Sequence, residues 1–83
     1  MPNRKLKVGD IVQVKFTDEV QLAFDRGMVS YNNGELYAVI ELVNSFGIIG
    51  TISRDGVTNG WHSDNFEWVG EGGMDELIRL VNL

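Results

Sequence analysis

Three adjacent residues, His62, Ser63 and Asp64, have the side-chain types of a hydrolase triad. In an extended segment, His62 and Asp64 point to one face and Ser63 to the other. A working triad needs the serine and the acid on opposite nitrogens of one imidazole, and the chain has a single histidine. These residues therefore do not form a triad, and we expect Ser63 or Asp64 to start a turn. No other acid, base and nucleophile have a workable spacing, so the sequence predicts a protein that is not an enzyme.

Metal and phosphate binding have little support. His62, Asp64 and Glu67 are possible ligands, but a zinc site draws on several histidines or cysteines, and the chain has one histidine and no cysteine. Calcium needs more oxygen ligands at regular spacing. The G-x-x-G from Gly47 to Gly50 encloses two isoleucines, whereas a phosphate-binding loop is polar and leads into a helix. We expect no metal and no cofactor, and interpret the glycines as points of bending or close approach in a core strand.

The aromatic residues give the strongest indication of binding. A domain of 83 residues has a thin core, and tryptophan and tyrosine are typical of protein interface hot spots. If Phe66 lies in the core, its strand neighbour Trp68 shares that face, and Trp61 is then the exposed tryptophan. The candidate partner-binding anchors are Tyr31, Tyr37, Trp61 and Trp68, with core packing as the alternative for each tryptophan.

Acidic residues gather late in the chain, and we predict that they form the charged rim of the binding surface. They are Asp64, Glu67, Glu71, Asp75 and Glu76. A glycosidase would need two facing carboxylates in a cleft, for which so short a chain has little room. The remaining alternatives are a solvated acidic face and an electrostatic surface for a basic partner protein.

Charge is divided unevenly along the sequence. Residues 1–15 carry a net charge of +3 from Arg4, Lys5, Lys7 and Lys15 against Asp10, and the rest carries three arginines against eleven acids, or −8. An acidic body repels a phosphate backbone. Nucleic acid is therefore the second alternative as partner, bound through the basic arm and stacking aromatics or mimicked by the acidic face.

Short strand-like segments separated by turn signals predict a small, mainly β domain. Asn33-Gly34, Asp55-Gly56 and Asn59-Gly60 are tight-turn signals. The expected strands cover 10–16, 27–32, 35–43, 46–53, the neighbourhood of Trp61, and 66–69. The segment 20–24 is either a strand or an irregular excursion. Residues 27–32 and 35–43 would form a hairpin, and 35–43, apolar on both faces, would be a central strand.

The last residues favour a short helix. Helical spacing over 74–83 places Met74, Leu77 and Ile78 on one side, and two acids fall in the first turn, where the helix dipole favours them. A strand is the rival interpretation. The helix would cap the barrel, or present Leu77, Leu80 and Leu83 to a partner or to a second copy as a homodimer. One domain then has a basic arm at 1–6, a barrel at 7–71 and a helix or extension at 72–83.

Two stretches resemble a known class. Lys7 to Val14, KVGDIVQV, resembles the V-G-D-x-V-x-V opening of small SH3-like barrels, and Trp61 to Val69, WHSDNFEWV, resembles the W-x4-F-E-x-V ending of short bacteriophage proteins of that class. The resemblance implies an SH3-like barrel of five to six short strands with a short C-terminal helix. It also implies a small acidic protein that binds, and inhibits, a host or viral protein. Trp68, where leucine is usual, and the tail 72–83 depart from the pattern.

The sequence also predicts where the protein acts. The basic residues at the start are followed by Val8, Gly9 and Asp10 where a signal peptide would have a long apolar run. No stretch approaches the roughly 20 apolar residues of a membrane-spanning helix. We therefore expect no membrane association and a cytoplasmic protein, located in the host cytoplasm if a phage encodes it.

Overall fold

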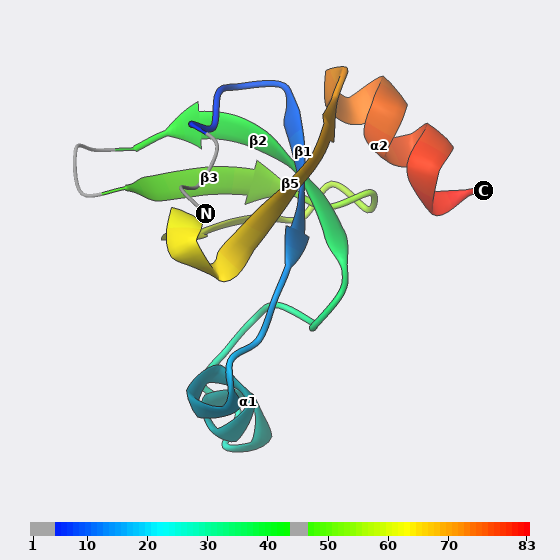
Figure 1. Ribbon diagram of the computed structural model, residues 1–83. Coiled ribbons are helices and arrows are strands. Elements are labelled where there is room, and N and C mark those ends of the chain that lie inside the picture. The colour runs from blue at the N-terminus through cyan, green and yellow to red at the C-terminus, as the bar shows by residue number, and fades with distance from the viewer. Residues whose placement is uncertain (1–4, 44–46) are drawn as a thin grey trace.

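One antiparallel sheet and two helices make up the computed structural model, which describes residues 5–43 and 47–83 (Figure 1). The strands are β1 (Asp10–Val14), β2 (Leu36–Leu42), β3 (Ile48–Ile52), β4 (Thr58–His62) and β5 (Phe66–Glu71), and the helices are α1 (Asp18–Asp25) and α2 (Gly73–Val81). A 3-10 turn, η1 (Ser63–Asn65), connects β4 to β5. The strand order is β4-β3-β2-β1-β5. The mainly β fold with a C-terminal helix is confirmed, and closure of the sheet into a barrel stays a prediction.

β2 lies at the centre of the sheet, as its two apolar faces predict. It pairs with β1 on one side, where Ala38 is opposite Ile11, and with β3 on the other, where Ala38 is opposite Ile52. The register shifts between Val39 and Glu41. A Cβ added at Gly50 would lie 3.2 Å from the Glu41 Cβ, so this glycine permits a close approach of β3 to β2, as expected.

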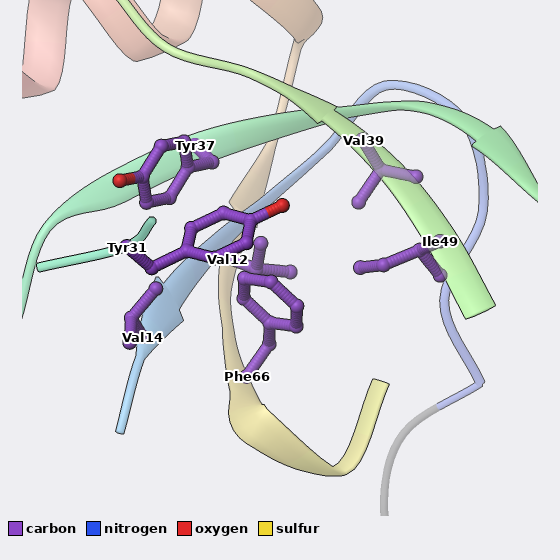
Figure 2. Close-up of a cluster of buried hydrophobic side chains, with 7 residues drawn as sticks. All are labelled: Val12, Val14, Tyr31, Tyr37, Val39, Ile49 and Phe66. Atoms are coloured by element: carbon purple, nitrogen blue, oxygen red, sulfur yellow. The ribbon is translucent and has the colours of Figure 1, made fainter. Parts of the chain in front are cut away.

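Each face of the sheet has its own core. The aromatic core contains Val12, Val14, Tyr31, Tyr37, Val39, Ile49 and Phe66, and Figure 2 shows the Tyr31 ring between those of Tyr37 and Phe66. The aliphatic core contains Ile11, Ala38 and Leu77, with further apolar side chains packed around them. α2 covers the aliphatic core beside β1 and β2 (Figure 1). Its one-sided apolar spacing thus gives the helix that the sequence predicts.

α1 replaces the strand or irregular excursion that the sequence predicts for residues 20–24. The Thr17 hydroxyl accepts a hydrogen bond from the backbone N–H of Val20 at 3.2 Å, and two acids occupy the first turn. At the other end Gly27 has a φ of +75°, and the N–H of Met28 donates to the Ala23 carbonyl at 2.9 Å. These are an N-cap and a Schellman C-cap. The expectation fails because the interior of this helix is apolar and strand-like, while its ends carry the helix signals.

The predicted hairpin of 27–32 with 35–43 is also wrong. Residues 28–30 follow α1 without forming a strand, and a turn at Asn33-Gly34 leads directly into β2. In that turn the N–H of Glu35 donates to the Asn32 carbonyl at 3.2 Å. Positive φ occurs at Gly34 and not at Asn33, which is typical of type II rather than the hairpin-forming type I′. The partners of β2 are instead β1 and β3.

The other two turn signals have opposite outcomes. Asp55-Gly56 lies in the turn that joins β3 to β4, and Gly56 has a φ of +84°. Asn59-Gly60 was predicted as a turn and instead lies inside β4, where Asn59 pairs with Thr51 and Gly60 with Gly50. Because the turn at 55–56 already sets the register of this hairpin, the second signal four residues later is overridden.

Candidate partner-binding site

Trp61 connects the aromatic core to the surface. Its indole stacks on the Tyr31 ring, with centroids 5.0 Å apart and planes 7° from parallel. Edge contacts join it to Phe16 at 6.4 Å and to Phe66 at 5.9 Å, and these distances fall in the attractive range for ring pairs. The side chain is half-buried. The expectation that Trp61 is the exposed tryptophan is therefore only partly met, because one of its faces is packed.

The two predicted tyrosine anchors lie in the core. Tyr31 is 3% exposed and its hydroxyl lies 2.8 Å from the Thr51 hydroxyl, while Tyr37 is 4% exposed and donates to a Glu35 carboxylate oxygen at 2.7 Å. Burial raises the pKa of both phenols, and the hydrogen bond to Glu35 raises the pKa of Tyr37 further. Both tyrosines are core residues with almost no surface to offer a partner, and Tyr31 in addition borders a pocket.

Trp68 and Phe66 share one face of the sheet, as the alternation predicts. The register places Phe66 opposite Val14 and Trp68 opposite Val12, and both valines belong to the aromatic core. Phe66 is buried and Trp68 is half-buried. Phe66 thus helps to close the core, and Trp68 lies further along the same strand, away from Trp61.

A pocket of about 140 Å³ opens beside Trp61, between β4 and the chain that follows α1. We call it the open aromatic pocket, and its lining residues are Met28, Val29, Ser30, Tyr31, Asn59, Gly60 and Trp61. Met28, one of these residues, is 75% exposed. The Phe24 ring, 36% exposed, contacts Phe16 with centroids 5.5 Å apart, and Phe16 contacts Trp61. Ring contacts therefore link the pocket to α1, which has no buried residue and leaves Leu22 56% exposed.

Sequence reasoning missed the residues of α1 in this surface. The sequence does not predict a helix for the segment that holds Leu22, Phe24 and Met28, so the exposure of these side chains could not be anticipated. The available signals were the N-cap Thr17 followed by two acids, and Gly27 at the far end. Those signals predict a helix. They do not predict that its apolar side chains stay unburied, which depends on where α1 lies relative to the sheet.

The predicted acidic rim is largely matched by basic side chains. A Glu71 carboxylate oxygen lies 3.2 Å from the Lys7 ammonium, and Glu67 forms an ion pair with Lys15. On α2, Glu76 pairs with Arg79 at 2.7 Å, and this hydrogen bond lowers the pKa of Glu76. Exposed pairs of this kind contribute little stability. They do reduce the local charge of β5 and α2, so the five acids do not form a uniformly negative face.

The same pairs bear on nucleic-acid binding. Lys7 and Lys15 are two of the four basic residues that were candidates for contact with nucleic acid, and each lies beside a glutamate on β5. Lys5 is exposed at the start of the described residues, and Arg4 lies outside them. A phosphate backbone would meet these carboxylates together with the lysines, which weakens the electrostatic attraction on which such binding depends.

His62, Ser63 and Asp64 lie at the start of the turn η1. The His62 Nδ1 accepts a hydrogen bond from the backbone N–H of Asp64 at 3.1 Å and thereby caps η1. The Asn65 amide donates to the His62 carbonyl at 3.2 Å. The turn occurs where the sequence predicts it, but the capping side chain is that of His62 rather than Ser63 or Asp64.

The described part of the chain also bears on metal binding and on membrane-spanning helices. Across residues 5–43 and 47–83, no group of three or more His, Cys, Asp or Glu side chains lies close enough together to hold a metal ion. Nor does either helix within those ranges have the length and apolar character needed to cross a membrane. No protein-family model, no curated protein and no solved structure matches this chain.

Proposed function

We propose that this chain is a non-enzymatic protein-binding module of bacteriophage origin that binds a host or viral protein and inhibits it by covering part of its surface. The observation that carries the proposal is the open aromatic pocket, lined by Trp61 and Tyr31 and linked to α1 through the Phe16 and Phe24 rings. Partner binding is expected at this pocket and along α1. The phage origin rests on the resemblance of the opening and closing motifs alone.

The composition of this surface fits a protein partner. Met28 leaves apolar area in water at the pocket, and Leu22 and Phe24 do so on α1. Exposed apolar patches mark interaction sites. The Trp61 and Tyr31 rings are stacked and held from behind by the core. A rigid aromatic wall loses little freedom on binding, which is why tryptophan and tyrosine dominate interface hot spots.

Charge favours a partner with a basic surface. The chain has a net charge of −5, and the basic side chains of Lys7, Lys15 and Arg79 already lie beside acids. The excess of acids that remains would speed encounter with a positively charged protein. It opposes the nucleic-acid alternative for the same reason.

A capture experiment tests the proposal. The tagged full chain is incubated with lysate of a bacterial host, and retained proteins are identified by mass spectrometry at low and high salt. Met28→Ser removes apolar surface at the pocket and Leu22→Ser removes it on α1. Both changes should cost little stability, because both side chains are largely exposed. Val8→Ser is the matched control, since Val8 is 60% and Leu22 56% exposed.

We expect one dominant protein to be retained by the unmodified chain and by Val8→Ser, and to be lost with Leu22→Ser and with Met28→Ser. High salt should reduce its recovery. Equal recovery with all three variants would contradict the proposal. Recovery of nucleic acid, or of proteins that nuclease treatment removes, would instead favour nucleic-acid binding.

A further inference from the structure

β4 is an edge strand of the sheet. It stands first in the strand order and pairs with β3, through contacts from Ile48 opposite His62 to Ile52 opposite Thr58. Within the described ranges no ladder forms on its other side. An edge strand presents unpaired N–H and C=O groups, which form a template for pairing with another extended chain.

The chain that faces this edge across the pocket also has free polar groups. Met28 to Tyr31 line one side of the open aromatic pocket and Asn59 to Trp61 line the other. Among residues 5–43 and 47–83, no backbone hydrogen bond joins these two segments, and the side chains of Ser30 and Asn59 form none. An inserted peptide would therefore find hydrogen-bond partners on both sides.

The size of the pocket fits one large side chain. Its volume is about 140 Å³, close to the roughly 150 Å³ of a cavity that holds one benzene molecule. Trp61 and Tyr31, whose rings are stacked, are among the lining residues. Met28, 75% exposed, also lines the pocket, and a flexible methionine thioether adapts to the shape of the group that enters.

The segments that flank the pocket and β4 are acidic. They are α1 with its C-cap (18–26), the turn before β4 (53–57) and η1 after it (63–65). Together they contain Asp18, Glu19, Asp25, Asp55 and Asp64 against Arg26 and Arg54, a net charge of −3. A peptide seated along β4 would lie within this negative field, so basic residues on either side of its apolar anchor would be favoured.

We infer that the outer edge of β4 takes up an extended, basic segment of the partner protein as an added strand, with one large apolar side chain of that segment in the open aromatic pocket. The inference rests on the proposed function and specifies its binding mode. Main-chain hydrogen bonds to β4 supply affinity, and the pocket and the acidic flanks supply specificity, as in other cases of strand addition. A helical or proline-rich segment would not use the β4 edge in this way.

Selection from a random 12-residue peptide display library tests the binding mode with the full chain as bait. Strand addition predicts a consensus with apolar residues at alternate positions, one of them large, flanked by lysine or arginine. The selected peptide should bind Met28→Arg at least tenfold more weakly than Val8→Arg, which carries the same added charge away from the pocket. N-methylation of the peptide's β4-facing amides should also cost about tenfold or more, because two or so hydrogen bonds are lost.

Hydrogen exchange identifies the edge itself. Bound peptide should slow exchange of the outward-facing amides of β4, and the N-methylated peptide should not. A consensus with helical i, i+3, i+4 spacing, a proline-rich consensus or a library that yields no enriched peptide would overturn the inference. So would a peptide affinity that is unchanged by both Met28→Arg and N-methylation.

In each of these cases the capture experiment decides separately on the proposed function. A protein that is captured by the unmodified chain and lost with Leu22→Ser would still support the proposed function, whereas capture that is unchanged by Leu22→Ser would contradict it as well.

Discussion

The two helices have similar first turns but different roles in the fold. Both have two acidic residues in the first turn, and they are similar in length. α2 buries Leu77 completely and packs Met74, Leu80 and Val81 around the aliphatic core. α1 buries no residue and leaves Leu22 56% exposed. In Figure 1, α2 lies against the sheet, whereas α1 lies beyond the end of β1.

This difference separates stability from recognition. α2 contributes the side chains that close one face of the sheet, so its apolar residues are already covered. α1 is defined by its caps, at Thr17 and Gly27, more than by packing, and its apolar residues remain available beside the open aromatic pocket. We therefore expect substitutions in α2 to change the free energy of unfolding and substitutions on α1 to change binding.

The largest effect is expected from a matched pair of leucines. Leu77→Ala removes a side chain that is 0% exposed and should lower the free energy of unfolding by about 3 kcal/mol. Leu22→Ala, on the exposed surface of α1, should change it by about 0.5 kcal/mol or less. Urea unfolding followed by tryptophan fluorescence measures both. Equal losses for the two variants would contradict the division of roles between the helices.

A smaller loss is expected in the wall of the pocket. Tyr31→Phe removes the hydroxyl that lies 2.8 Å from Thr51, a residue that is 0% exposed. Loss of a buried hydrogen-bond partner costs about 1–2 kcal/mol. Tyr37→Phe should cost less, because its partner Glu35 is only half-buried and retains access to water. Denaturant midpoints of the two variants rank these costs, and the reverse order would show that the Tyr31–Thr51 bond is not what holds this wall.

The cap of α1 should have an effect of about 1 kcal/mol. Thr17→Ala removes the hydroxyl that accepts from the Val20 N–H, and lost N-caps typically cost about this much. Because α1 has little packing to resist fraying, the loss should appear mainly as faster amide exchange in residues 18–26. Thr17→Ser keeps the acceptor and is the control. Exchange that is unchanged in Thr17→Ala would mean that contacts other than the cap hold α1.

The smallest effect is expected at the ion pair on α2. The hydrogen bond from Arg79 lowers the pKa of Glu76 below its ordinary 4.5. A carboxylate whose pKa is lowered on folding stabilises the fold above its unfolded pKa, and this contribution disappears as pH falls through the folded value. Arg79→Gln should therefore make a small difference at pH 7 that shrinks as the pH is lowered below the ordinary pKa of 4.5 and also shrinks in high salt. A difference that does not shrink as the pH is lowered would assign the role of Arg79 to packing instead.

Local pattern was sufficient for most of the sheet and for α2. Hydrophobic periodicity indicates which side of an element is buried. It did so for the alternation in β1, for the two apolar faces of β2 and for the one-sided spacing of 74–83. The same logic failed for residues 20–24. These residues are apolar without being buried in a core, so their hydrophobic pattern reports neither a strand nor a packed helix.

The candidate site was harder to predict than the fold. Trp61 was identified, but its stacking on Tyr31 depends on a ring that comes from a non-strand segment thirty residues earlier in the sequence. Tyr37 was predicted as an anchor and is buried, because its position on the central strand decides its exposure. The sequence predicts that the acids of β5 belong to a charged rim. Their pairing with Lys7 and Lys15 depends on two segments far apart in the sequence becoming neighbours in the fold, which local pattern does not reveal.

Methionine methyl resonances report on both regions in one spectrum. Met28 lines the pocket and is 75% exposed, whereas Met74 belongs to α2 and packs against the aliphatic core. With [13C]methyl-labelled methionine, and assignment by Met→Leu replacement, the captured partner protein is added to the labelled full chain. We expect the Met28 methyl to shift or broaden while that of Met74 stays in place. A shift of Met74 with Met28 unchanged would place the partner on α2 and contradict the assignment of recognition to α1 and the open aromatic pocket.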